Sequence, residues 1–144
     1  AEKKRDKIDY MWRDVQRRAI FYGFDAKVPA PYPLKEFDLA NKVAILGKDQ
    51  GWIKEYTILT YKKWFLEHLE PGSEPNLSSS LKEIGLDSES VIKMAQTDEI
   101  EQKYLQNTEM AKNKGIFGSP TFIVENEVFW GDDRCEDAIK WLLK

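Results

Sequence analysis

The amino-acid sequence predicts an α+β chain that is mainly helical and that ends in a β-hairpin followed by one helix. Over the first 114 of the 144 residues, apolar side chains recur at helical spacing. After Gly115, two short runs rich in β-branched and aromatic residues flank a polar turn, which is typical of a hairpin. Helical spacing returns from Asp132 to the end. The length is that of one ordinary domain.

The first predicted helix covers residues 3–22 and is followed by a rigid connector. One apolar stripe runs along this helix, formed by Ile8, Met11, Trp12, Val15 and Ala19. Gly23 is a suitable stop signal. Residues 28–34, Val-Pro-Ala-Pro-Tyr-Pro-Leu, are expected to be extended, because each proline fixes its φ angle and disfavours helix at the preceding residue.

Two further helices are predicted over residues 36–49 and 52–68. The first is expected to direct five apolar side chains inward, namely Phe37, Ala40, Val43, Ala44 and Leu46. The second is apolar over a broad arc that includes Trp52 and Trp64, so we expect it to be largely buried. We interpret these tryptophans as core residues and not as a platform for a ligand.

Three more helices are expected before the hairpin. A short apolar stripe over residues 77–84 ends at Gly85, and a second short helix follows as far as Gln96. A longer helix over residues 97–114 opens on acidic side chains, which interact favourably with the positive end of the helix dipole. Gly115 ends it.

The predicted hairpin has strands over residues 121–124 and 128–130, with Glu125-Asn126-Glu127 as the turn. The Asn-Gly pair that favours tight turns is absent. Two strands alone make a marginal sheet, so we expect further strands from the sequence before Ala1 or from another chain. The final helix is expected to bury four side chains, those of Ala138, Ile139, Leu142 and Leu143.

Composition and charge exclude several function classes. The formal net charge of −3 provides no basic field that would attract nucleic acid. No apolar run approaches the roughly 20 residues that span a bilayer, and no signal peptide is visible. Because Cys135 is the single cysteine, the chain forms no internal disulfide, and we expect a cytoplasmic protein. The single histidine, His68, argues against a histidine-rich zinc site, so no metal is predicted.

Two segments could carry chemistry. In Gly118-Ser119-Pro120-Thr121, a proline stands directly before a strand and is a candidate for a cis peptide bond. The segment 130–134, Trp-Gly-Asp-Asp-Arg, lies at a strand-to-helix turn, where backbone N–H groups and the helix dipole suit a carboxylate. The two aspartates could equally be ordinary helix caps, and capping is compatible with binding.

The pattern over residues 115–134 carries a family resemblance. Gly-x-Phe-Gly-x-Pro-Thr-Phe, a hairpin and Trp-Gly-x-Asp-Arg resemble the C-terminal portion of 2-hydroxychromene-2-carboxylate isomerases. These enzymes belong to the DsbA-like and kappa-class glutathione transferase branch of thioredoxin-like proteins. Upstream, the segments 10–14 (Tyr-Met-Trp-Arg-Asp), 31–33 (Pro-Tyr-Pro) and 107–109 (Asn-Thr-Glu) also resemble that family.

The resemblance implies a thioredoxin-like fold of the DsbA or kappa type, in which a βαβ unit is followed by a helical insertion and a ββα unit. Residues 1–114 would be the insertion with the long helix that returns to the core, and 115–144 would be the ββα part. The βαβ unit, of roughly 30 or more residues, would precede Ala1. It would carry the catalytic serine, so the chain is expected to be a fragment in which no residue is assigned a catalytic role.

The resemblance also implies glutathione as cofactor and a small aromatic acid as substrate. The backbone of Ser119, shaped by Pro120, would pair with the cysteinyl part of glutathione as an added strand. The γ-glutamyl end would lie at the following turn. Four residues would form that end of the site, namely Trp130, Gly131, Asp132 and Asp133. Asp133 would hold the α-ammonium group, whereas Asp132 stands where the kappa branch has a serine.

The resulting function is a glutathione-dependent cis–trans isomerase that acts on intermediates of aromatic-ring degradation. A kappa-like glutathione transferase or a DsbA-like thiol–disulfide oxidoreductase remains an alternative within the same branch. A third hypothesis is an inactive fragment that self-associates through its unpaired hairpin, and a homodimer is expected. We expect Arg134 to pair with a nearby acid of the protein, and Cys135 to be a helix residue and not a nucleophile.

Overall fold

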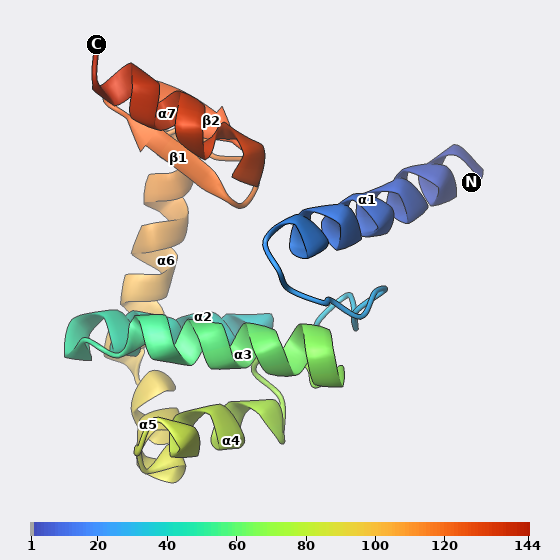
Figure 1. Ribbon diagram of the computed structural model, residues 1–144. Helices are drawn as coiled ribbons and strands as arrows, with labels where there is room; N and C mark the ends of the chain where they lie inside the picture. Colours follow the sequence, from blue (N-terminus) through green and yellow to red (C-terminus); the bar gives the residue numbers. More distant parts are fainter. Residues whose placement is uncertain (1) are drawn as a thin grey trace. The chain divides into compact units, whose positions relative to one another are not determined.

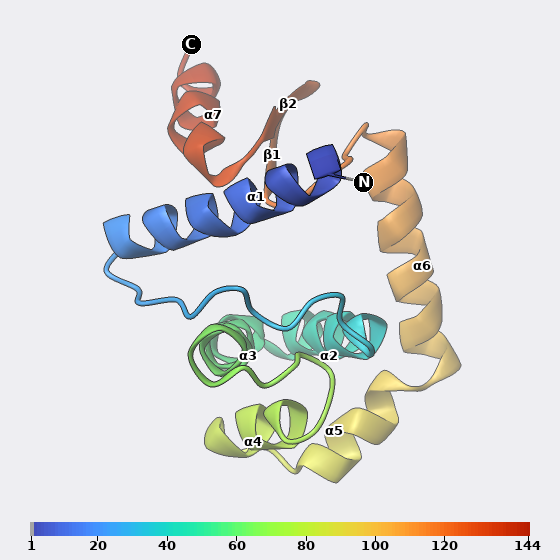
Figure 2. The ribbon, with the colours of Figure 1, turned by 90° about the vertical axis from the view of Figure 1, so that its right-hand side faces the viewer.

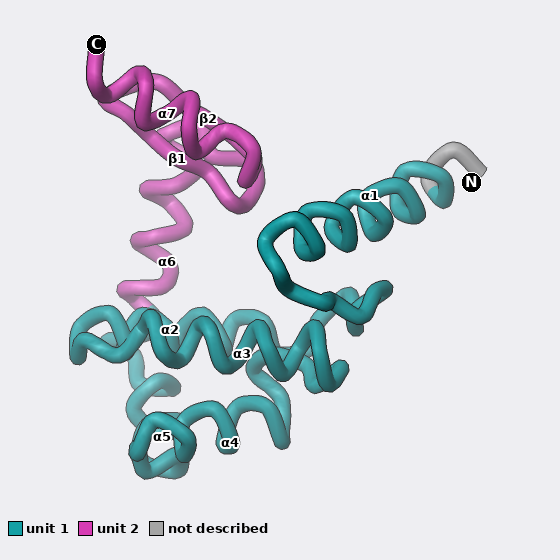
Figure 3. The backbone as a smooth tube through the Cα atoms, in the orientation of Figure 1, with its two compact units in different colours: residues 1–101 teal, residues 102–144 magenta. Residues whose placement is uncertain are grey.

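The computed structural model describes the backbone of residues 2–144 and the side chains from Arg5 onward. The chain forms two compact units, residues 1–101 and residues 102–144, which are coloured separately in Figure 3. Each unit is described by itself. Within the described residues, no helix has the length and apolar character needed to cross a membrane.

Unit 1 is entirely helical in its regular structure (Figure 1). Its elements are α1 (Glu2–Phe21), α2 (Phe37–Gln50), α3 (Ile53–Glu67), α4 (Asn76–Glu83), α5 (Ser88–Ala95) and the first turn of α6 (Asp98–Asn113). Unit 2 contains the rest of α6, β1 (Thr121–Val124), β2 (Glu127–Trp130), the 3₁₀ turn η1 (Asp132–Arg134) and α7 (Cys135–Leu142). The predicted order of helices, hairpin and final helix is confirmed, as is the mainly helical α+β class.

The core of unit 1 is built by α2 to α5 together with the start of α6. Helices α2 and α3 pack side by side, and α4 and α5 lie against them (Figures 1 and 2). The side chains that form this core are Val43, Leu46, Tyr56, Leu77, Leu81, Val91, Ala95 and Ile100. Their removal from water is the main favourable contribution to the stability of the unit.

A buried polar side chain joins α3 to α4. Asn76 is fully buried and donates hydrogen bonds to the carbonyl oxygens of Thr60 at 3.1 Å and Leu69 at 2.8 Å. Its own Oδ1 accepts a hydrogen bond from Ser80 Oγ at 3.0 Å. Every polar atom of this side chain thus has a partner, which is the condition under which a buried amide is tolerated.

Helix α1 begins and ends within one residue of the predicted bounds, but its apolar stripe is not buried. Ile8 is 51% exposed and Met11 is 43% exposed, whereas Trp12, Val15 and Ala19 are half-buried. Within unit 1, no other described helix packs closely against α1. Periodicity correctly predicted the helix and its apolar face, but it carries no information on which surface covers that face.

Two predictions of burial in α2 and α3 are wrong. Phe37, expected to point inward, is 53% exposed, since it stands at the first turn of α2 beyond the core. Helix α3, expected to be largely buried, buries only Tyr56, Thr60 and Lys63. The aromatic and aliphatic residues on its opposite side, such as Tyr61, remain exposed because α2 and α4 cover one face of this helix only.

The hairpin of unit 2 is tighter than predicted. Strands β1 and β2 are antiparallel, and their register runs from Thr121 opposite Trp130 to Val124 opposite Glu127. Glu127 was expected in the turn, but it belongs to β2, so the turn has two residues. Glu125 takes a positive φ of 56°, which is the backbone conformation that two-residue hairpin turns require at their first position.

Helix α7 packs on the hairpin with less of its surface than the sequence indicated. Ala138 is buried as predicted, but Ile139, Leu142 and Leu143 are 52%, 67% and 79% exposed. That part of the prediction is wrong for the described residues. Two short strands offer a narrow apolar face, which α7 contacts on both strands, and the Trp141 ring of α7 lies 6.3 Å from the Phe129 ring of β2.

Candidate functional site

The hairpin brings the two predicted site segments together. The N–H of Gly131 donates to the carbonyl oxygen of Pro120 at 3.0 Å, immediately beyond the last strand pair. The Ser119–Pro120 peptide bond is cis, as are three other X-Pro bonds of the chain. Ser119 and Pro120 are both exposed, so the segment that enters β1 and the segment that leaves β2 form one accessible surface at the same end of the hairpin.

The backbone of Ser119 is available to a ligand. Within the described part of the chain, neither its N–H nor its C=O makes a hydrogen bond to another backbone group. The preceding residue is held in place, because the Thr121 hydroxyl donates to the carbonyl oxygen of Gly118 at 2.6 Å. An exposed N–H and C=O at the start of a strand can pair with an extended peptide, as in strand addition to a sheet edge.

Two exposed aromatic rings, those of Phe117 and Trp130, form what we call the aromatic shelf. Their centroids are 5.0 Å apart in an edge-to-face arrangement, with Phe117 73% exposed and Trp130 55% exposed. The Trp130 indole lies directly over Gly118, where a Cβ atom would overlap its Nε1. Gly118 is therefore required for Trp130 to lie beside Ser119.

Of these residues, Trp130 was singled out from the sequence as a binding residue, but Phe117 was not. The sequence signal available for Phe117 was its position in the Gly-x-Phe-Gly motif. The motif could not reveal the contact with Trp130, because that contact depends on the hairpin register.

The turn after β2 contains the remaining predicted residues. Gly131 has a φ of 120°, a conformation that side-chain-bearing residues rarely adopt, and a Cβ there would contact the Asp133 carboxylate. Asp132 and Asp133 are exposed and form the start of η1. Arg134 pairs with Asp133 at 3.5 Å and with Asp137 at 2.9 Å, which confirms the prediction that it pairs with acids of the protein.

The ion pair of Asp133 limits how strongly this residue could attract a ligand cation. The side chains of Asp133 and Arg134 are 56% and 52% exposed, so water screens both charges. Exposed ion pairs of this kind contribute only about 0–1 kcal/mol. An ammonium group placed here would share the carboxylate with Arg134 and could not rely on charge alone.

Two further residues were singled out from the sequence, Cys135 in unit 2 and His68 in unit 1. Cys135 is the first residue of α7 and is half-buried, consistent with the prediction of a helix residue. His68 ends α3 in the left-handed conformation, is exposed, and hydrogen-bonds through Nε2 to the carbonyl oxygen of Lys27 at 3.0 Å.

Known relatives resemble the chain over almost its whole length. It is 23% identical over 137 residues to a 2-hydroxychromene-2-carboxylate isomerase of Sphingobium xenophagum, and 23% identical over 128 residues to the enzyme of that name from Pseudomonas putida. A solved structure of selenomethionine 2-hydroxychromene-2-carboxylate isomerase superposes with a TM-score of 0.81 and is 24% identical. That structure covers 96% of this chain and confirms the fold.

The relatives are longer than this chain. The matched regions cover 95% and 89% of this chain but only 69% of the Sphingobium enzyme and 62% of the Pseudomonas putida enzyme. For the solved structure the covered share is 68%. The predicted resemblance to this group of proteins is confirmed, while the activity of the longer relatives is a matter of proposal for the 144 residues.

One family also matches from the first residue almost to the last. Its description is DSBA-like thioredoxin domain, and the match covers residues 1–140. With the helical region, the hairpin and most of the final helix inside the matched range, the chain belongs to the DsbA-like thioredoxin domain family.

Proposed function

We propose that the chain is the glutathione-docking part of a glutathione-dependent isomerase of the 2-hydroxychromene-2-carboxylate type. This enzyme would act on intermediates of aromatic-ring degradation. The names of its relatives support the isomerase activity, and the glutathione dependence rests on the family resemblance of the sequence. One contact carries the proposal, namely the hydrogen bond at 3.0 Å between Gly131 N–H and the carbonyl oxygen of Pro120. Through it, the segment that contains Ser119 and the turn at 131–133 lie at the same end of the hairpin.

In the proposed complex, glutathione lies along the end of the hairpin. The N–H and C=O of Ser119 pair with the cysteinyl residue, as an added antiparallel strand. The γ-glutamyl carboxylate lies at the N-terminal end of η1 and α7, where backbone N–H groups and the helix dipole favour an anion. The α-ammonium group lies beside Asp133, and the aromatic shelf flanks the ligand.

The proposed reaction uses the thiol of glutathione and not a side chain of these 144 residues as nucleophile. The thiolate forms a C–S bond to a conjugated carbon of the substrate, and the displaced π electrons move onto the carbonyl oxygen. The former double bond then rotates as a single bond. Return of the electrons expels the thiolate and restores the double bond. The protein would lower the pKa of the thiol and hold the adduct in place.

We further propose that the group that activates the thiol lies outside these 144 residues, in a βαβ segment of the thioredoxin-like fold. This is compatible with the share of the relatives that the chain spans, between 59% and 69%. The proposal gives none of the neighbouring side chains this role, since the Thr121 hydroxyl donates to the carbonyl oxygen of Gly118 and Asp133 is paired with Arg134.

The family match favours a second candidate, thiol–disulfide exchange. That chemistry needs two cysteines close together, and Cys135 is the single cysteine of this sequence. A CxxC pair would therefore have to come from other residues. If the complete protein has a serine where the first cysteine of a CxxC pair would stand, the exchange reaction is excluded and the isomerase is favoured.

The proposed docking mode is tested by an affinity cycle on the 144-residue chain. The affinity for glutathione and for its analogue without the α-amino group is measured by calorimetric titration, for the native chain and for Asp133→Asn. We expect Asp133→Asn to weaken glutathione binding by roughly two- to fivefold, since the pair is exposed. The analogue should bind both proteins with the same affinity.

Asp137→Asn is the matched control, because Asp137 also pairs with Arg134 but lies outside the proposed site. This variant should leave both affinities unchanged. The docking mode is wrong if Asp133→Asn weakens the two ligands equally, or if Asp137→Asn reproduces its effect.

A further inference from the structure

The hydroxyl of Thr121 holds a peptide group at the start of β1. It donates to the carbonyl oxygen of Gly118 at 2.6 Å, which is a short O–H···O hydrogen bond within the normal range. Thr121 is half-buried, whereas the two residues that the bond spans, Ser119 and Pro120, are exposed. The hydrogen bond thus closes a small loop around the backbone that the proposed function assigns to glutathione.

This contact determines the direction of the Ser119 N–H. The Gly118 carbonyl and the Ser119 N–H belong to one planar peptide group, which is trans, since each cis bond among the described residues precedes a proline. In a trans peptide group the C=O and the N–H point in opposite directions. Because the oxygen is turned toward the Thr121 hydroxyl, the Ser119 N–H is directed away from that side chain.

A second contact restricts the same peptide group from one side. The Trp130 indole lies directly over Gly118, so closely that a Cβ atom at Gly118 would overlap its Nε1. Glycine has no side chain that limits its backbone rotation, so the peptide group would have several orientations without these two contacts. The ring blocks one side, while the Thr121 hydroxyl supplies the directional interaction.

A fixed N–H matters for a ligand that binds by strand addition. Its main-chain hydrogen bonds weaken steeply when the donor and acceptor are misaligned. If only a fraction of the chains presents the N–H in the competent direction, the apparent dissociation constant rises by the inverse of that fraction. A hydroxyl that fixes the peptide group before the ligand arrives therefore increases the affinity without touching the ligand.

We propose that Thr121 is a positioning residue for the docking of glutathione. Its hydroxyl acts through the peptide group between Gly118 and Ser119, and it orients in advance the N–H that pairs with the cysteinyl residue. The inference rests on the proposed function for the identity of the ligand. The orientation of the peptide group, in contrast, is a property of the chain without ligand, so the two can be tested separately.

The first measurement uses the 144-residue chain without ligand. Amide ¹⁵N relaxation gives the order parameter of the Ser119 N–H, which is about 0.85 for a rigid backbone and below about 0.6 for a flexible one. We expect the rigid value in the native chain and the flexible value in Thr121→Val, which keeps the side-chain shape and loses the hydroxyl. Thr121→Ser restores the hydroxyl and should restore the rigid value.

The second measurement is a calorimetric titration of the same proteins with glutathione. Thr121→Val should weaken binding roughly three- to tenfold, and Thr121→Ser should stay within about twofold of the native affinity. Thr108→Val is the matched control, because the Thr108 hydroxyl also donates to a backbone carbonyl, that of Tyr104 at 3.0 Å on α6. This variant should change neither the order parameter of Ser119 nor the affinity.

Three results would overturn the inference. The first is an order parameter of the Ser119 N–H that Thr121→Val leaves unchanged or that Thr121→Ser does not restore. The second is a native affinity for glutathione in Thr121→Val. The third is a control, Thr108→Val, that reproduces both effects. Failure of the proposed function is distinct, since the native chain would then not bind glutathione although Thr121→Val still loosened the Ser119 N–H.

Discussion

Hydrogen bonds of single buried side chains add to the stability that the small apolar core provides. Asn76 is the clearest case, because its amide satisfies carbonyl groups of α3 and of the loop before α4 while accepting from Ser80. Nothing in the sequence distinguishes Asn76 from other asparagines. Its role depends on the packing of α4 against α3, which brings three separate partners within hydrogen-bond distance.

We expect Asn76→Ala to lower the free energy of unfolding by about 2–4 kcal/mol, since it leaves buried carbonyl groups without a donor. Urea unfolding of the native chain and the variant measures this difference. Asn107→Ala is the control, because Asn107 is exposed on α6, and its effect should stay within about 0.5 kcal/mol. Equal effects of the two substitutions would show that the hydrogen bonds of Asn76 contribute nothing specific.

Asp87 gives a pH-dependent contribution at the start of α5. The Ser90 hydroxyl donates to its carboxylate at 2.7 Å and holds the pKa of Asp87 below its usual value. A carboxyl whose pKa is lower in the folded state stabilises the fold above its unfolded pKa. That stabilisation is lost as the pH falls through the folded pKa.

Ser90→Ala should therefore raise the pKa of Asp87 toward its usual value, as measured by NMR titration of the carboxyl carbon. The stability difference between the native chain and this variant should be present at neutral pH and vanish in acid. A pKa of Asp87 that does not change in Ser90→Ala would contradict the assignment of the hydrogen bond as its main cause.

At the scale of elements, the helices and the hairpin could be predicted because their signals are local. Helical periodicity, stop glycines and β-branched runs determine where the elements begin and end to within a few residues. Burial could not be predicted in the same way. The exposed faces of α3 and α7 contain apolar side chains. Only the arrangement of the neighbouring elements shows that each of these helices is covered on one side and exposed on the other.

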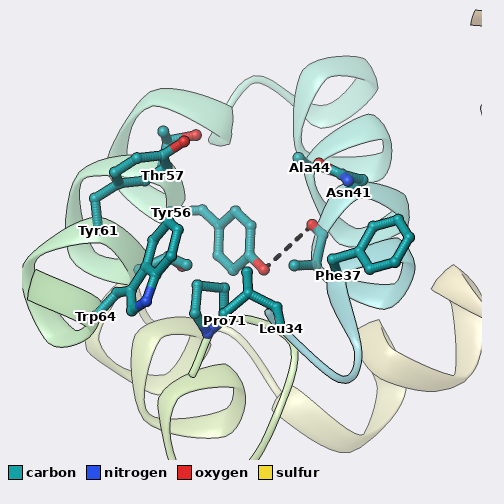
Figure 4. A pocket seen from close by; sticks show the side chains of 11 residues that line it. Leu34, Phe37, Asn41, Ala44, Tyr56, Thr57, Tyr61, Trp64 and Pro71 are labelled. Atoms are coloured by element: carbon teal, nitrogen blue, oxygen red, sulfur yellow. Dashed lines mark hydrogen bonds between the residues drawn. The ribbon is translucent and has the colours of Figure 1, made fainter. Parts of the chain in front are cut away.

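For the candidate site, too, the local motifs could be predicted from the sequence, but their arrangement in space could not. Ser119 and Gly131 could be singled out from their motifs, but their proximity comes from the hairpin register, which was not predicted. The predicted second strand began one residue late, at Val128. The sequence did not reveal a pocket between α2 and α3 of unit 1, which Tyr56, Tyr61 and Trp64 help to line (Figure 4). Its lining residues lie up to 37 positions apart, and only helix packing brings them together.

The hairpin turn allows a matched test of element stability. Glu125 adopts a φ of 56°, which costs a residue with a side chain about 1–2 kcal/mol. Glu125→Gly should relieve this cost and slow hydrogen exchange of the β1 and β2 amides. Glu127→Gly, in the strand opposite Val124, should accelerate it. If both substitutions accelerate exchange, the positive φ at Glu125 is not a source of strain.

At the scale of the whole molecule, the chain exposes apolar surface on each unit. Ile8 and Met11 of α1 are exposed, as are Leu142 and Leu143 at the end of α7. Exposed apolar patches of this kind promote association. We expect sedimentation equilibrium to detect dimers of the 144-residue chain, and the substitutions Leu142→Glu and Leu143→Glu together to shift it toward monomer. A chain that remains monomeric at all accessible concentrations would contradict this expectation.

Membership of the DsbA-like thioredoxin family fixes the fold of the molecule but not its chemistry. The central claim is that these 144 residues carry the glutathione-docking part of an isomerase and not its catalytic group. Backbone amide shifts on titration with glutathione test it most directly. We predict changes at Ser119, Thr121 and residues 131–133, with no turnover of 2-hydroxychromene-2-carboxylate by the same sample. Shifts confined to other residues, or measurable isomerase activity of this chain alone, would contradict the account.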